Sequence, residues 1–138
     1  MRVLMPLPDV DFDPTETAVP WRTLTREGHE VIFATETGGG PPAGDGKLLD
    51  GSLGSLGPAA EARAHYDEMA AAPEFQRPIA WSAIEPDEYD GLILPGGHAP
   101  GMRQYLGSSL LQDKVATYWR TGRPVGAICH GVLVLARA

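Results

Sequence analysis

The residue with the clearest chemical potential is Cys129, the only cysteine in the chain. It lies in the segment Ala127-Ile128-Cys129-His130-Gly131, with a small residue two positions to either side. This spacing is typical of a nucleophile elbow, where a strand turns sharply into a helix and larger side chains would collide. The thiol would then face solvent at a helix N-terminus, whose free N–H groups favour the thiolate. A buried structural cysteine is the alternative interpretation of the same residue.

Two further residues could move protons near such a thiol. His130 follows the cysteine directly and could act as acid or base if both side chains turn into one pocket, but it could equally be a hydrogen-bond partner at a helix terminus. Glu16 occupies the third position of a predicted helix that has Asp13 as its cap and Pro14 as its first residue. On composition alone, a capping box with Asp13 is the favoured role for Glu16.

The elements that must position these residues follow from hydrophobic patterns and breakers. Buried strands alternate with helices, which predicts β-α-β units with right-handed crossovers in a doubly wound sheet. The segment 37–58 has eight glycines, three prolines and no apolar period, so it is predicted to be a long surface loop. Leu111, Val115, Tyr118 and Trp119 are predicted to share one helix face. The predicted strands cover residues 2–7, 30–35, 90–95 and 124–128, and the predicted helices cover residues 14–27, 59–72, 101–106 and 109–121, with a polar turn at 9–13.

Length and charge narrow the classes of protein. A chain of 138 residues is predicted to form one domain, and its net charge of -7 argues against binding to nucleic acid or to an anionic membrane. The N-terminus offers no apolar run long enough for a signal peptide or a spanning helix, so a cytoplasmic location is expected. One cysteine cannot build a thiolate metal site, and the acidic triplet Asp9, Asp11 and Asp13 lacks the glycine and glutamate of a calcium loop. Neither a metal nor a cofactor is expected.

Three segments together resemble one family. The sequences AICHG at 127–131, LPGGH at 94–98 and TETAVPW at 15–21 are similar to motifs of the ThiJ/PfpI superfamily, relatives of class I glutamine amidotransferases. They occur in the order that the family has and span most of the chain. The resemblance implies a flavodoxin-like sandwich with a mostly parallel central sheet and Cys129 at the carboxyl ends of its strands.

The resemblance also implies roles for individual residues. Glu16 would hydrogen-bond the thiol, and the backbone N–H groups of Gly97 and His130 would form an oxyanion hole. The Gly96-Gly97 pair would permit the close approach that a side chain would block, and His98 would border the same pocket. Trp21 is close enough to Glu16 in the sequence to line the pocket, although packing is the default role for a tryptophan.

The Cys-His pair is similar to the glyoxalase III and PfpI-type branches of the superfamily. It implies a cysteine-dependent enzyme that acts on small reactive carbonyl compounds, as a glyoxalase III-like hydratase or lyase. A PfpI-type cysteine peptidase or amidohydrolase is the alternative, and a non-catalytic redox-sensing or chaperone-like protein is a third.

The sequence ends at Ala138, within the predicted elbow helix, so the C-terminal part of the family's fold is expected to be missing. The apolar run at 132–135 is then expected to pair with a second copy or with a C-terminal fragment.

Overall fold

The centre of the molecule is a five-stranded sheet in which every neighbouring pair of strands is parallel. The computed structural model describes residues 1–138. The strand order is β5-β3-β1-β6-β7, so the first strand of the chain lies in the middle and β7 lies at an edge. The strands are β1 (Arg2–Pro6), β3 (Glu30–Thr35), β5 (Ile79–Ala80), β6 (Gly91–Leu94) and β7 (Val125–Ala127).

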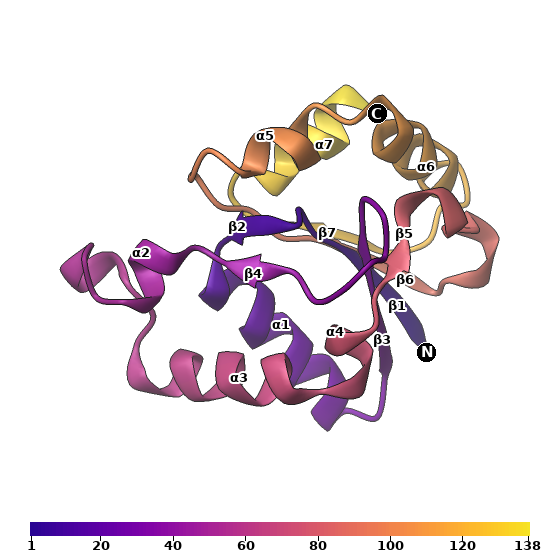
Figure 1. Cartoon of the computed structure of the whole chain (residues 1–138). Coiled ribbons are helices and arrows are strands. Elements are labelled where there is room, and N and C mark those ends of the chain that lie inside the picture. The colour runs from indigo at the N-terminus through magenta and orange to yellow at the C-terminus, as the bar shows by residue number, and fades with distance from the viewer.

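Helices cover both faces of this sheet, as Figure 1 shows. On one face lie α1 (Pro14–Arg26), α3 (Ala60–Ala71) and α4 (Pro73–Gln76), and on the other lie α5 (Met102–Leu106), α6 (Ser109–Trp119) and α7 (Gly131–Arg137). The predicted doubly wound α/β sandwich with a mostly parallel sheet is therefore confirmed. None of the helices combines the length and the apolar character needed to cross a bilayer.

The long helices begin and end where their capping residues predict. The side chain of Asp13 accepts hydrogen bonds from the amides of Thr15 and Glu16 at 2.8 and 3.1 Å, which satisfies donors that the first turn of α1 leaves free. Gly28 follows the end of α1 with a φ of 78°, a conformation that glycine adopts without cost. The hydroxyl of Ser108 accepts from the amide of Leu111 at 3.1 Å and caps α6 in the same way.

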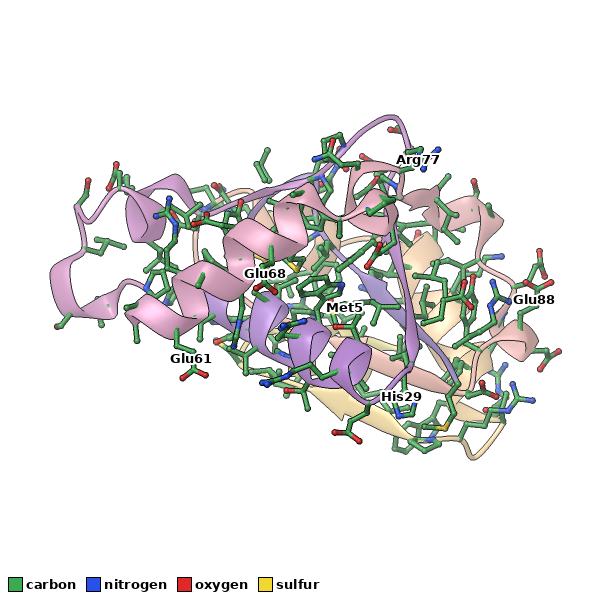
Figure 2. The ribbon with its side chains drawn as sticks, turned by 90° about the horizontal axis from the view of Figure 1, so that it is seen from below. Met5, His29, Glu61, Glu68, Arg77 and Glu88 are labelled. Atoms are coloured by element: carbon green, nitrogen blue, oxygen red, sulfur yellow. The ribbon has the colours of Figure 1, made fainter.

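The core lies between the sheet and the two helical layers. Met5 in the central strand is fully buried, and Figure 2 shows it in the interior while Glu61 and Glu88 project outward. Phe75 packs edge-on against Phe33 and Phe12, with ring centroids 5.1 and 6.1 Å apart. These contacts fix α4 against the sheet and against the segment that precedes α1.

The polar segments at 9–13 and 37–58 are more ordered than the sequence predicts. They contain a second, two-stranded parallel sheet formed by β2 (Val10–Phe12) and β4 (Ala43–Gly44), followed by α2 (Gly46–Leu49) and the 3-10 helix η1 (Gly54–Leu56). The amide of Ala43 donates to Asp9 at 2.9 Å, and the amide of Asp45 donates to Phe12 at 2.8 Å. Such short strands depend on backbone contacts between distant segments, so no local hydrophobic pattern predicts them.

Helix α3 ends at Ala71, close to the predicted end at residue 72, and Pro73 is the first residue of the separate helix α4, a position that suits its fixed φ. One prediction about the helices is wrong. Trp119 was expected to share the buried face of α6, but its side chain is 59% exposed whereas Leu111, Val115 and Tyr118 are buried. Successive helical residues are rotated by about 100°, so when Tyr118 faces the core its neighbour points to the side. The remaining short elements are the 3-10 helices η2 (Trp81–Ala83) and η3 (Pro86–Glu88).

Candidate active site

Cys129 occupies a tight turn between the end of β7 and the start of α7. Its φ is 50°, in the left-handed region that non-glycine residues rarely adopt. The amide of Ile128 donates to Leu94 at 3.0 Å, and the amide of Gly131 donates back to Ile128 at 2.8 Å. These bonds hold the turn on both sides, and the thiol at its apex is exposed. Strain of this kind, maintained by the surrounding structure, is the mark of a nucleophile elbow.

Two glycines allow the elbow to lie directly on the segment that follows β6. A Cβ atom on Gly131 would overlap the carbonyl oxygen of Leu94 and would lie 2.6 Å from that of Pro95. A Cβ atom on Gly96 would lie 2.6 Å from the carbonyl oxygen of Ile128 and 2.8 Å from the amide nitrogen of His130. Any side chain at either position would therefore force the two backbones apart.

Glu16 faces this junction from the first turn of α1. Its Oε2 accepts a hydrogen bond from the amide of Gly96 at 3.0 Å. In a capping box it would instead accept from the amide of Asp13, but that amide donates to the carbonyl oxygen of Gly96 at 2.8 Å. The helix cap is supplied by the Asp13 side chain alone, and the carboxyl of Glu16 remains available to the site.

The environment of Glu16 favours its protonated form. Burial raises the pKa of its carboxyl above the ordinary value, and the neighbouring Asp13 carboxylate raises it further. A hydrogen bond with the Cys129 thiol, the bond from the Gly96 amide and the charge of His98 act in the opposite direction but do not cancel the increase. The carboxyl of Glu16 thus lies within hydrogen-bond reach of the thiol and holds a proton more tightly than a carboxyl in water.

Two histidines stand on the open side of the elbow. The Nδ1 atom of His130 lies 3.5 Å from the sulfur of Cys129, a hydrogen bond whose direction depends on the tautomer of the ring. The ring of His98 meets that of His130 edge-on, with centroids 6.2 Å apart. Both rings are exposed, so they can reach a molecule bound at the thiol.

The amides of Gly97 and His130 are free to bind an anion. Neither donates a hydrogen bond to another atom of the chain. Gly97 has a φ of 147°, and a Cβ atom there would lie 2.9 Å from the carbonyl oxygen of Asp11 and 3.0 Å from the amide of Asp13. Only glycine fits this position, where the backbone packs closely against the segment that precedes α1.

The structure does not bring Trp21 to this site. Its side chain is only 6% exposed and belongs to the main core, and the indole Nε1 donates to Glu74 at 3.0 Å. Trp21 lies more than one turn beyond Glu16 on α1, toward the end of the helix that is remote from the elbow. Its predicted role in lining the pocket is wrong, and the packing alternative holds.

The sequence did not reveal the residues of α5 that border the site. A hollow of about 190 Å³ opens beside His130 and is lined by two loop segments and one face of α5. A helix of five residues is too short for its sequence to show which side chains face a pocket. The only signal was its place directly after the Gly96-Gly97 turn. The lining residues are Gly97, His98, Ala99, Pro100, Met102, Arg103, Leu106 and His130.

The chain that carries this elbow, the Gly96-Gly97 turn and Glu16 on α1 matches a known protein family. The family model described as ThiJ/PfpI family-like matches residues 7–138, which is nearly the whole chain. The chain belongs to the ThiJ/PfpI family. The resemblance of the three short motifs at 15–21, 94–98 and 127–131 is therefore confirmed.

Curated relatives of this ThiJ/PfpI protein include several deglycases. It is 30% identical to a deglycase of Pyrococcus abyssi over 138 residues, which covers 100% of this chain and 66% of the relative. It is also 30% identical to protein/nucleic acid deglycase 2 of Escherichia coli over 129 residues, which covers 93% of this chain and 59% of the relative. The chain thus spans about two thirds of the length of the first relative and about three fifths of the second.

Solved structures show the same fold. Glyoxalase III from Candida albicans superposes with a TM-score of 0.71 at 22% identity, covering 97% of this chain and 59% of that one. A ThiJ/PfpI domain protein from Brachyspira murdochii superposes with a TM-score of 0.70 at 15% identity, covering 99% and 63%. At these low sequence identities, the superpositions show a shared fold and nothing about activity.

The contact between the elbow and β6 can be tested by replacing Gly131 with alanine. The added methyl group meets two backbone carbonyl oxygens, so we expect a loss of roughly 1–3 kcal/mol or more in the free energy of unfolding. Gly46→Ala is the matched control, because a Cβ atom there meets nothing within 4 Å. Urea titration measures both, and equal stability of the two variants would contradict the close approach.

The environment of Glu16 predicts how stability depends on pH. Because its pKa is raised in the folded state, the stability it contributes is fully present below its unfolded pKa and is lost as the pH rises through the folded pKa. Glutamine carries no charge at any pH. We therefore expect the melting temperature of Glu16→Gln, relative to the native protein, to be higher at pH 7 than at pH 4. Glu85→Gln, at an exposed position, should show no such trend, and a trend common to both variants would contradict the assignment.

Proposed function

We propose that this protein is a cysteine-dependent enzyme that converts small α-oxoaldehydes, such as methylglyoxal, to 2-hydroxy acids without glutathione. The observation that carries the proposal is the geometry at Cys129. An exposed thiol lies on a strained turn, next to the Glu16 carboxyl with its raised pKa, and the N–H groups of Gly97 and His130 donate no hydrogen bond within the chain. The names of the deglycase relatives agree with chemistry on reactive carbonyl adducts.

In the proposed first step the sulfur of Cys129 adds to the aldehyde carbon. The thiol gives its proton to His130, a carbon–sulfur bond forms, and the electron pair of the C=O bond moves to oxygen. The amides of Gly97 and His130 stabilise the oxyanion, which then takes a proton from Glu16. The product is a hemithioacetal, and Glu16 is left as a carboxylate that can act as a base.

In the proposed second stage the hydrogen on the former aldehyde carbon moves to the adjacent carbonyl carbon by way of an enediol. Glu16 and His130 carry the protons. The aldehyde carbon is oxidised to a thioester while its neighbour is reduced to an alcohol, so no external oxidant is needed. Water then attacks the thioester, the sulfur leaves, and a 2-hydroxy acid is released. The net change is the addition of one water molecule to the oxoaldehyde.

The hollow beside His130 has room for a small carbonyl compound. Its volume is about 190 Å³, which at ~30 Å³ for a water molecule corresponds to roughly six water molecules. A compound with five or six heavy atoms fits that space. An adjoining hollow of about 780 Å³ also borders His98, so peptidase or amidohydrolase activity stays the alternative use of the same thiol.

The proposal predicts which substitutions remove activity. Cys129→Ala should abolish consumption of methylglyoxal while the circular dichroism spectrum is retained, because the nucleophile is lost and no core contact changes. Glu16→Gln should lower the rate by ~100-fold or more, the usual contribution of general acid–base catalysis. Methylglyoxal loss and lactate formation are measured together. Undiminished turnover by Cys129→Ala would overturn the assignment of the nucleophile.

We also propose that the edge of the sheet at β7 is an association surface. β7 has a partner on one side only, and its residues are half-buried. Nearby, α6 and α7 border a mostly apolar groove of about 260 Å³ that includes Trp119 and Leu135, and Val132 on α7 is 46% exposed. Exposed sheet edges and apolar patches are usually covered in proteins. For the chain on its own, the available occupant is a second copy.

Sedimentation velocity at micromolar concentration tests this association. We expect a dimer, and we expect Trp119→Lys to shift the population toward monomer because it places a charge in the apolar groove. Arg63→Glu on α3, on the opposite face of the sheet, should leave the distribution unchanged. A strictly monomeric, cooperatively melting chain would contradict the proposal.

A further inference from the structure

Arg103 is an unpaired cation that shares a hollow with His130, the residue after Cys129. Its side chain is exposed, it lines the hollow that also contains His130, and its guanidinium forms neither an ion pair nor a hydrogen bond within the chain. By contrast, Arg2, Arg22 and Arg63 each pair with a carboxylate. No carboxylate lines this hollow, and its other ionisable members are the two histidines His98 and His130.

A neighbouring hollow has the opposite charge from the one that Arg103 lines. On the other side of His98 lies a larger hollow of about 780 Å³, whose lining includes Asp11, Asp45 and Asp50 but only one cation, Lys47. A negatively charged group near Cys129 would be repelled by that acidic lining and attracted to Arg103. The two hollows share His98, Ala99 and Pro100, so a ligand beside His98 is exposed to both fields.

The position of Arg103 is fixed by its neighbours in α5. Gln104, the next residue, exchanges hydrogen bonds of 2.8 Å with Asp9 in both directions and donates to Glu36 at 2.6 Å. The amide of Gly101, just before the helix, donates to the side chain of Asp11 at 2.7 Å. These bonds tie α5 to the segment that leads into α1 and Glu16. The backbone that carries Arg103 is therefore anchored beside the hollow that contains His130.

We propose that Arg103 is a specificity-determining residue that binds a carboxylate of the substrate. A guanidinium offers a planar pair of N–H donors that matches a carboxylate, and a charge-assisted bond of this type discriminates between charged and neutral ligands. The preferred substrates are α-oxoaldehydes that carry a carboxylate at their far end. This inference deepens the proposed function, since it assumes that the aldehyde carbon reacts with Cys129.

The test compares an anionic and a neutral substrate of similar length, 4,5-dioxopentanoate and 2-oxohexanal. We expect the native protein to have the higher kcat/KM for the anion. Arg103→Met, which keeps most of the aliphatic stem, should lower kcat/KM for the anion by about 10-fold and change it for the neutral compound by less than about threefold, as expected for loss of one charged hydrogen bond at an exposed site. Arg103→Lys should retain part of the preference.

Arg26→Met serves as the matched control, because Arg26 is exposed and unpaired at the far end of α1 and its loss changes the net charge equally. It should leave both substrates unaffected. An equal loss of activity toward the two compounds in Arg103→Met, or no loss toward either, would overturn the proposal. If Arg103→Met fails to fold, Arg103→Lys and Arg103→Gln provide the same comparison.

A binding measurement separates this inference from the proposed reaction. Pyruvate is titrated into the full chain while the ring signals of His98 and His130 are followed by NMR. We expect saturable shifts that need about 10-fold more pyruvate in Arg103→Met but not in Arg26→Met. That result would support the carboxylate site even if neither oxoaldehyde were consumed, whereas unchanged pyruvate affinity in Arg103→Met would overturn it even if turnover were observed.

Discussion

The candidate site depends on one constraint, the direct contact between the backbone after β6 and the backbone of the elbow. Gly96 and Gly131 lie at this contact, where any Cβ atom would collide with a carbonyl oxygen. Because the two segments touch, the Gly96-Gly97 turn lies against the turn that carries the thiol, and Glu16 can reach the Gly96 amide from a third element. The parallel order of β6 and β7 makes this possible, since neighbouring parallel strands deliver their carboxyl ends to one edge.

Carboxylates in the segment before α1 hold the surrounding loops in place. Asp13 caps α1, Asp11 accepts from the Gly101 amide, and Asp9 binds Gln104 and the amide of Glu36. Asp11 does so with a φ of 74°, a conformation that aspartate tolerates better than most residues. The triplet that superficially resembles a cation site is thus occupied by backbone and side-chain N–H donors, and it links α1, which carries Glu16, to α5. Shortening any of these side chains would leave a donor without its partner.

The sequence predicts an element or a site residue only where the signal lies in the residues next to it. The sequence predicts the strands β1, β3, β6 and β7 and the cap at Asp13 because each strand has its own apolar run and α1 has its own capping residue. The motif at 127–131 predicted the elbow because its small residues are needed where they stand. By contrast, β2, β4 and β5 consist of two or three residues paired with distant segments, and Trp21 differs from a pocket residue only in the direction it faces. Arg103 was missed for the same reason, since a single short helix carries no periodic pattern.

The raised pKa of Glu16 has a consequence for the proposed chemistry. A thiolate and a carboxylate held side by side repel each other, so an ionised Glu16 would oppose the nucleophile that it is meant to assist. Burial on α1 and the Asp13 carboxylate both raise the pKa of Glu16 and so lessen that repulsion. Asp13 therefore contributes twice: its side chain caps the helix that carries Glu16, and its charge shifts Glu16 toward the neutral carboxyl. In the proposed mechanism this distribution of charge makes Glu16 a better proton donor to the oxyanion than a carboxyl in water.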